Sequence, residues 1–583
     1  MVNENKSKKI LLLYVLIGIG FLIFLGVMLS TSLNPRHLPS LYAKKSSKAE
    51  RGSIISADGF HIASTKKLYK AVVNNRYIDP QKEELFIELF SIYSGIKSSV
   101  VRKRLKKRQG VVVLSYLIQE KQAQYLKKLA YELRRYKVFL SLKNKRTGLL
   151  SLHGLSILES GETRVYPYGD VLTPIIGYPH KLEDEGYTRI KGVKGLEKRF
   201  DDDLLARGDG SSQGKRDINS YIILNKDSFT KPSLNGLDIK LTIPISLQIK
   251  IERMCSKMQK DLRAYQILFA VMNSNTGKVL AVVSSNRFLP KKIRRSDYPA
   301  LNAGVIEYSF EPGSVMKPVT FALLLDKNLI NPYDLVNGHN GKYTIGKKTI
   351  TDEHPFDWLS AEDVIVHSSN VGIAQLAQKL TAQEFHQGLK DFGFSQKSTL
   401  DLIYEKVGTI PRISQLQRRI YKATTSYGYS IRANLMQILR AYSIFNNNGQ
   451  MVRPQLVASF IDEFGNELIH ENEEGIQVIK SSTAARMKDI LIKTVQKGTG
   501  VKTRVKGLVV GGKTGTAHIV ENGKYVKKYN TVFAGFVNDE HTNYTMVAVV
   551  VKPKKSQFAS RTAVPVFRKA IEIMIEEGYL TPL

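Results

Sequence analysis

Residues 311–325 read EPGSVMKPVTFALLL, in which a polar turn leads directly into an apolar run. Ser314 and Lys317 stand three positions apart, and side chains at this spacing share one face of a helix, about 5–6 Å apart. A lysine held against an apolar wall has its charged form disfavoured, so its neutral amine can take the proton of a serine hydroxyl. The stretch predicts a serine nucleophile and its base in the first turn of a helix.

Two companion motifs downstream support this interpretation, because the spacing alone also occurs at four other serines. Ser368 begins a Ser-Ser-Asn motif, which offers a hydroxyl and the amide of Asn370 ahead of an apolar helical run. Residues 513–517 read KTGTA within a β-rich run. A cation, a hydroxyl and a glycine on a strand present an edge that can bind a carboxylate. The three motifs in this order predict a serine acyl-transfer site.

Strand and helix patterns surround the motifs. Residues 267–283 contain two apolar runs around an Asn/Gly-rich turn, which predicts a β-hairpin. Three further β-rich runs cover 507–520, 531–537 and 544–551, and an amphipathic helix is expected around 566–574. Strands bracketed by helices predict an α+β fold, with a sheet covered by helices.

An uncharged segment of twenty residues, Ile10–Leu29, lies near the N-terminus. At about 1.5 Å per residue it spans roughly 30 Å, the thickness of a hydrocarbon core. A cleaved signal peptide has a shorter apolar region and a small-residue cleavage site, which 30–35 (STSLNP) fits poorly. We expect a single-pass signal anchor at 10–30 and a cytoplasmic tail at 1–9, with the bulk of the chain outside.

The composition is that of a globular protein with a strong positive charge. The 583 residues include 87 Lys and Arg against 52 Asp and Glu, a formal charge of +35. This charge favours lipid headgroups or an acidic wall polymer as surroundings, and nucleic acid is not expected because the anchor places the bulk outside. A single cysteine, Cys255, excludes an intramolecular disulfide and a Cys-cluster metal site. We predict no metal and no cofactor.

A basic stretch and several aromatic or imidazole side chains leave alternatives open. Residues 102–146 contain fifteen Lys and Arg and are predicted as a long helical stretch, either a solvated face or a docking face for lipid or wall polymer. Phe356 and Trp358 are expected in the core, with a cleft wall as the alternative. Three histidines near the motifs are interpreted as solvated or packed side chains, since metal-ligand spacing is absent: His354, His367 and His518.

The three motifs resemble the signatures of the penicillin-binding proteins and serine β-lactamases. Three N-terminal stretches resemble those of class B high-molecular-mass penicillin-binding proteins: RGSIISADG at 51–59, RVYPYG at 164–169 and GVKGLE at 192–197. One departure is Ser56-Ala57, where the family more often has Asp-Arg. The resemblance implies an elongated mixed α/β pedestal, or dimerisation-like, module at 31–235. It implies a penicillin-binding transpeptidase domain at 236–583, similar to serine β-lactamases, with a helix-covered antiparallel sheet.

The resemblance also implies a role for each motif. Ser314 attacks the carbonyl between the two terminal D-alanines of a peptidoglycan stem peptide, and Lys317 takes its proton. Ser368 relays a proton to the departing D-alanine, while Asn370 holds the amide of the donor peptide. The backbone N–H groups of Ser314 and Thr516 form the oxyanion hole. The strand motif binds the substrate, chiefly its terminal carboxylate, through Lys513, Thr514, Gly515 and Thr516.

A membrane-anchored D,D-transpeptidase of septal wall synthesis, inhibited by β-lactams, is therefore the leading hypothesis. Glu311 before Pro312 resembles the division branch, and an elongation-specific enzyme is the alternative. Implied partners are stem peptides, β-lactams, a glycan polymerase of the SEDS family and other division proteins at the inner membrane. A β-lactamase or carboxypeptidase is disfavoured by the large module before the catalytic domain. A β-lactam sensor is disfavoured by the short tail.

Overall fold

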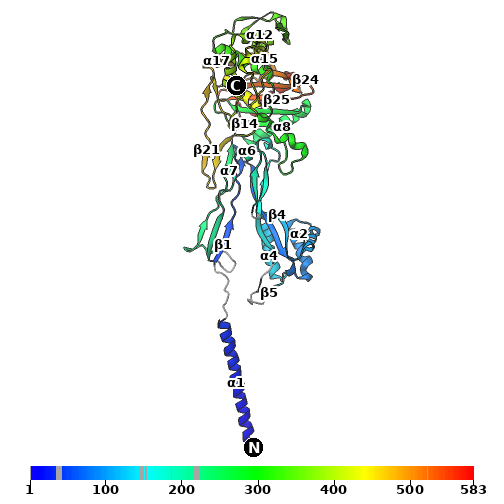
Figure 1. Cartoon of the computed structure of the whole chain (residues 1–583), viewed down its shortest axis with the longest axis vertical. Helices are drawn as coiled ribbons and strands as arrows, with labels where there is room; N and C mark the ends of the chain where they lie inside the picture. The colour runs from blue at the N-terminus through cyan, green and yellow to red at the C-terminus, as the bar shows by residue number, and fades with distance from the viewer. Residues whose placement is uncertain are drawn as a thin grey trace.

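The molecule is elongated, with an isolated N-terminal helix at one end and the C-terminal domain at the other (Figure 1). The computed structural model describes residues 2–33, 42–143, 150–151, 154–184, 187–215, 222–521 and 523–583. Helix α1 (Val2–Leu33) includes the predicted span, and its side chains from position 6 onward are exposed. Among the described residues it is the one helix long and apolar enough to cross a membrane.

The module after α1 is built on long antiparallel strands flanked by helices. Strand β3 (His61–Asn74) pairs with β4 (Val111–Gln119) on one side and with β7 (Ser156–Val165) on the other. Its other strands are β1 (Tyr42–Ser47), β5 (Leu142–Lys143), β6 (Leu150–Ser151), β8 (Pro179–Asp184), β9 (Tyr187–Gly192), β10 (Gly210–Lys215) and β11 (Phe229–Lys231). Its helices are α2 (Glu83–Ser94), α3 (Ser98–Lys107), α4 (Glu120–Arg135), α5 (Thr173–Ile176), α6 (Gly195–Arg199) and α7 (Asp201–Leu204).

The prediction of one long helical stretch at 102–146 is wrong. Strand β4 separates α3 from α4, and it begins just after Gly110, whose φ is +104°. The run VVVLSYLI at 111–118 is rich in β-branched and aromatic residues, which favour an extended backbone. Pairing with β3 buries Leu114 and Ile118 of this run, whereas the basic residues of α3 and α4 keep to exposed helix faces.

A nine-stranded sheet continues from the module into the C-terminal domain. Its order is β21-β20-β12-β2-β3-β7-β9-β8, with β4 beside β3. Strand β2 (Ile54–Ile55) pairs in parallel with β12 (Asp238–Leu241), which pairs antiparallel with β20 (Val457–Ile461). Strand β21 (Glu467–Ile469) completes this edge. Because hydrogen bonds and a common apolar core cross the junction, the two parts are held together as one body.

Buried ion pairs join the three N-terminal motifs at this junction. The Arg51 guanidinium lies 2.8 Å from a carboxylate oxygen of Glu197 and 2.8 Å from one of Asp201. Arg164 contacts the other oxygen of Glu197 at 2.7 Å and donates to the carbonyl of Gly52 at 2.6 Å. The stretch around Arg51 thus meets two stretches that follow it by more than a hundred residues, at one buried carboxylate.

The C-terminal domain contains a five-stranded antiparallel sheet in the order β14-β13-β25-β24-β23. The predicted hairpin is confirmed as β13 (Gln266–Asn273) and β14 (Val279–Ser284). The three predicted β-rich runs are confirmed as β23 (Val509–Glu521), β24 (Lys524–Asn538) and β25 (Asn543–Val551).

Helices cover both faces of this sheet, as the sequence predicts. Ile267 and Phe269 of β13 face α8 (Ile245–Leu262) and α18 (Ala563–Glu576), the expected C-terminal helix. The alternate residues Leu268 and Ala270 face the opposite core, where all twelve residues of α16 (Leu435–Asn446) are buried. A strand buried on both sides has to be apolar at consecutive positions, which explains the continuous apolar run.

A helical subdomain, in which α12 and α15 lie at the end of the molecule farthest from α1, contacts the edge strand β23 through α17 (Figure 1). Its helices are α10 (Lys317–Asp326), α11 (Ala361–Val366), α12 (Asn370–Leu376), α13 (Ala382–Asp391), α14 (Ile413–Leu416), α15 (Arg419–Ser426) and α17 (Ser481–Lys497). Short strands around it are β15 (Leu335–Asn337), β16 (Lys342–Ile345), β17 (Lys348–Thr351) and β18 (Trp358–Ser360). The short helix α9 (Gly304–Glu307) instead packs on β13, β14 and α16, and β19 (Gln450–Met451), which pairs with β22 (Ile476–Gln477), also packs on α16. The three motifs meet where this subdomain faces the sheet.

Candidate active site

Ser314 lies in a short 3₁₀ turn, η4 (Gly313–Met316), immediately before α10. Ser314 thus lies in the 3₁₀ turn, and Lys317, three residues later, lies in the α-helix that continues it. The turn is tightly held, because the Tyr442 hydroxyl donates to the carbonyl of Val315 at 2.8 Å. A Cβ on Gly428 would lie only 2.1 Å from the carbonyl oxygen of Gly313, so this approach requires glycine. These contacts fix the backbone of the turn that carries Ser314.

Lys317 is the first residue of α10 and is fully buried. Its Nζ donates to the carbonyl oxygen of Ser368 and, at 3.1 Å, to the Ser368 hydroxyl. Burial lowers the pKa of Lys317 to about 7, against the opposing charges of Asp352 and Glu353. Near neutral pH a large share of this side chain is thus a neutral amine, which can accept a proton.

Ser368 lies between α11 and α12 in a left-handed backbone conformation, with φ at +63°. This conformation is unfavourable for a non-glycine residue and tends to mark functional sites. The Ser368 hydroxyl accepts a hydrogen bond from Lys513 at 2.8 Å in addition to the one from Lys317. One serine oxygen thus connects the two buried lysines.

The other two residues of the Ser-Ser-Asn motif have different surroundings. Ser369 is buried at the N-cap of α12, where its hydroxyl accepts from the N–H of Gly372 at 2.8 Å and donates to Asp352 at 2.6 Å. The Asn370 side chain donates to the carbonyl of Thr351 at 2.9 Å and lines the cleft. Asp352 thus orients the motif. No sequence motif points to this carboxylate, because a lone acidic residue after a short hairpin has no recognisable spacing.

The strand motif lies on β23, the edge strand of the five-stranded sheet. Alternation along the strand buries Lys513 and Gly515, while Thr514 and Thr516 are half-buried and line the cleft. A Cβ on Gly515 would lie 2.9 Å from the carbonyl oxygen of Pro312 and 3.0 Å from the Val315 side chain. Glycine therefore lets the strand pack against the turn that carries Ser314.

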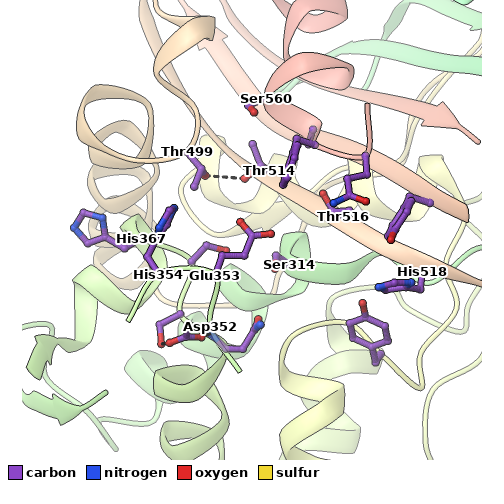
Figure 2. A pocket seen from close by; sticks show the side chains of 18 of the residues that line it. Ser314, Asp352, Glu353, His354, His367, Thr499, Thr514, Thr516, His518 and Ser560 are labelled. Carbon is purple, nitrogen blue, oxygen red and sulfur yellow. Dashed lines mark hydrogen bonds between the residues drawn. The ribbon is translucent and has the colours of Figure 1, made fainter. Parts of the chain in front are cut away.

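Together these elements enclose a cleft of about 280 Å³ (Figure 2). Of the eight predicted site residues, five line the cleft: Ser314, Ser368, Asn370, Thr514 and Thr516. Lys317 and Lys513 lie buried behind it on Ser368, and Gly515 lies between Thr514 and Thr516. The close-up also shows two lining residues that the sequence analysis missed, Glu353 and Thr499, with the Thr499 hydroxyl 2.7 Å from that of Thr514.

The remaining aromatic and histidine predictions have mixed outcomes. Trp358 is 60% exposed, so its predicted core position is wrong, and strand β18 holds it at the surface. Phe356 is half-buried and lines the cleft, with its ring centroid 5.3 Å from that of His367. His354 and His518 also line the cleft. All three histidines thus surround the cleft as partly or fully exposed rings.

The two buried lysines favour binding of an anion in the cleft and transfer of a proton to Lys317. Burial and the neighbouring Lys317 both lower the pKa of Lys513, against the charge of Glu353. Two buried ammonium groups so close together repel each other, and an anion bound in the cleft would relieve this repulsion. The site can therefore attract a carboxylate while Lys317 accepts a proton from a nearby hydroxyl.

Comparisons with known proteins agree with this geometry. A model of the family described as "Penicillin binding protein transpeptidase domain" matches residues 267–572, and one described as "Penicillin-binding Protein dimerisation domain" matches residues 46–241. The chain is a class B penicillin-binding protein. As a member of this family, the protein is a serine-type transpeptidase.

Relatives cover much of this penicillin-binding protein at low identity. "Stage V sporulation protein D" of Bacillus subtilis is 26% identical over 531 residues, which make up 89% of this chain and 76% of the relative. "Peptidoglycan D,D-transpeptidase FtsI" of Buchnera aphidicola is 26% identical over 74% of this chain and 72% of its own. The solved structure of "Penicillin Binding Protein 2X" from Streptococcus thermophilus is 20% identical with a TM-score of 0.74, over 93% of this chain and 82% of that one. This structural likeness shows the shared fold.

Proposed function

We propose that this protein is a peptidoglycan D,D-transpeptidase that cross-links stem peptides through an acyl-enzyme on Ser314. The observation that carries the proposal is the convergence of Lys317 and Lys513 on the Ser368 hydroxyl, beside a cleft that contains Ser314. The arrangement connects a proton acceptor, a proton relay and an anion-binding group. Relatives named peptidoglycan D,D-transpeptidases support the choice of substrate.

In the first step, Lys317 takes the proton of the Ser314 hydroxyl as its oxygen bonds to the carbonyl carbon between the terminal D-alanines. The C–N bond to the last D-alanine breaks. Its nitrogen receives the proton from Lys317 through the Ser368 hydroxyl, which lies 3.1 Å from the Lys317 amine. D-alanine leaves, and an ester on Ser314 remains.

In the second step, an amine from a neighbouring stem peptide attacks the ester carbon. Its proton passes back along the same path to the Ser314 oxygen as the ester bond breaks, and a new amide forms. We assign the donor's terminal carboxylate to Lys513, Thr514 and Thr516, and the donor amide to Asn370. The backbone N–H groups of Ser314 and Thr516 are our proposed oxyanion hole.

We further propose that the catalytic domain lies outside the cytoplasmic membrane and acts in septal wall synthesis with a SEDS-family polymerase. The apolar stretch of α1 and the lysines at the N-terminal end of the same helix support the orientation. Glu311 before the catalytic turn supports the division branch. Septal localisation of a fluorescent fusion is the expected result, and a distribution along the side wall would favour the elongation branch instead.

The experiment for the chemistry uses the full chain in detergent with a fluorescent penicillin. We expect an adduct that persists for hours in the wild type and is absent from Ser314→Ala. Rapid release of the label would assign the protein to the hydrolases and contradict the proposal. No labelling of the wild type would mean that the three motifs do not form a working site.

A further inference from the structure

A second groove, of about 1190 Å³, opens beside the catalytic cleft. Its walls are the C-terminal end of α8, residues 527–529 of β24 and the segment 552–561 after β25. Eight of its sixteen lining residues are Lys or Arg, and none is acidic. Such a concentration of one charge sign in a concave surface attracts anions.

The basic groove is continuous with the catalytic cleft. Tyr529, Gln557 and Phe558 line both. A chain lying in the groove can therefore extend to Ser314 without crossing another part of the surface. The half-exposed rings of Tyr265 and Phe558 add apolar surface to the walls.

Backbone hydrogen bonds fix the shape of the groove. The N–H of Lys554 and that of Lys555 donate to the carbonyl of Leu262 at 3.2 and 3.3 Å. The N–H of Lys552 donates to the carbonyl of Tyr529 at 3.0 Å. The cationic side chains therefore project from a preformed wall, which reduces the cost of ordering it on binding.

Most of the positive charge in the groove is uncompensated. Glu521 pairs with Lys528 at 2.9 Å and with Lys552 at 3.1 Å. Six other cationic side chains are exposed and make no ion pair with any residue that the structure describes: Lys260, Arg263, Lys527, Lys554, Lys555 and Arg561. Screening acts over about 8–10 Å in physiological salt, so neighbouring members of this set act together on a bound anion.

We propose that the basic groove binds the second peptidoglycan strand, through the carboxylates of its stem peptides, and so presents the acceptor amine to the acyl-enzyme. This inference rests on the proposed function. The continuity with the cleft favours a substrate strand over other anions. A lipid surface is disfavoured, because β24 and β25 lie toward the end of the molecule opposite α1 (Figure 1).

The test uses the full chain in detergent and fluorescently labelled, uncross-linked glycan strands that bear stem peptides. The groove variant is Lys527→Gln with Lys554→Gln and Lys555→Gln, which removes three exposed charges and keeps the backbone donors. The matched control is Lys103→Gln with Lys106→Gln and Lys107→Gln on α3, which removes three exposed charges elsewhere. Binding is expressed per penicillin-reactive molecule, so that unfolded protein does not count.

We expect the groove variant to bind strands about tenfold more weakly than the wild type, and the control to bind within about twofold of it. Strands with amidated carboxylates should bind the wild type as weakly as native strands bind the groove variant. Equal binding by the groove variant and the wild type would overturn the inference. Groove-dependent binding of phosphatidylglycerol vesicles or a polyphosphate, without binding of strands, would overturn it as well.

The two proposals fail in distinguishable ways. Wild-type protein that takes no penicillin label contradicts the proposed function, whatever its affinity for strands. Wild-type protein that is labelled normally, with binding that does not depend on the groove lysines, contradicts only the acceptor groove.

Discussion

The molecule contains two buried clusters of charged side chains, which differ in whether an opposite charge is present. At the junction of module and catalytic domain, Arg51 and Arg164 both contact Glu197. In the active site, Lys317 and Lys513 instead share the uncharged oxygen of Ser368. Within the part of the chain that the structure describes, neither lysine forms an ion pair with a carboxylate.

The two clusters favour opposite charge states: the pKa of Glu197 is lowered, which keeps it charged, whereas the lowered pKa values of Lys317 and Lys513 favour neutral amines. Burial alone would raise the pKa of Glu197, yet Arg164 and Arg51 hold it below its usual value. Burial lowers the pKa of both Lys317 and Lys513, and the nearest carboxylates do not reverse the shift. Both clusters are buried, so the neighbouring group decides the charge state. A group of opposite charge keeps a buried side chain charged, whereas an uncharged neighbour leaves it able to lose its proton.

The largest effect is expected from replacing Lys317, the amine that accepts the proton of Ser314. Lys317→Ala should lower the rate of penicillin acylation by about 10²–10⁴, because Ser314 loses its general base. Stopped-flow or gel-based labelling measures this rate. Lys327→Ala, at the exposed end of the same helix, is the matched control and should react like the wild type. Acylation of Lys317→Ala at the wild-type rate would remove Lys317 from the mechanism.

Breaking the ion pairs of Glu197 with Arg51 and Arg164 should lower stability and not activity. Glu197→Gln leaves two buried guanidinium groups facing a neutral amide, and we expect a loss of about 3–5 kcal/mol. Thermal unfolding of the full chain in detergent measures the shift, with the exposed Glu183→Gln as control. The molecules that remain folded should still label with penicillin at the normal rate. An unchanged melting temperature would show that the ion pairs do not hold the junction.

The pH dependence of acylation tests the proton of Lys317 directly. Because its pKa is lowered to about 7, the amine is protonated below that pH and neutral above it. The acylation rate should therefore rise with pH and level off above about pH 7, with a change of about tenfold between pH 6 and pH 8. The profile of Lys317→Ala should lack this step. A flat wild-type profile would contradict the assignment.

The smallest effects are expected from replacing the two adjacent serines, Ser368 and Ser369, which should alter different properties. Ser369→Ala removes the N-cap of α12 and should destabilise the protein by about 1–2 kcal/mol. Ser368→Ala should leave the melting temperature nearly unchanged but slow acylation, because the hydroxyl between the lysines is lost. Thermal melts and labelling rates on both variants check this division. The reverse pattern would exchange the roles of the two residues.

Local patterns predicted much of the fold because they depend on neighbours in the sequence. The hairpin at 267–283 and the helix around 566–574 follow from turn residues and apolar periodicity, and both are confirmed. In the stretch 102–146, apolar residues at helical spacing suggest one long helix, whereas pairing with β3 makes 111–119 a strand. Trp358 was misplaced because a large aromatic side chain was assumed to be buried.

By itself, the sequence determined the N-terminal apolar helix, the periods of most strands and helices, and the residues of each of the three motifs, since each of these features lies within a short contiguous stretch. Only the tertiary structure decided the environment of those residues. The lowered pKa of Lys317 depends on burial, and the role of Asp352 depends on a hairpin that reaches α12. The basic groove collects lysines from 260, 527–528 and 552–555, because electrostatic effects act through space rather than along the chain.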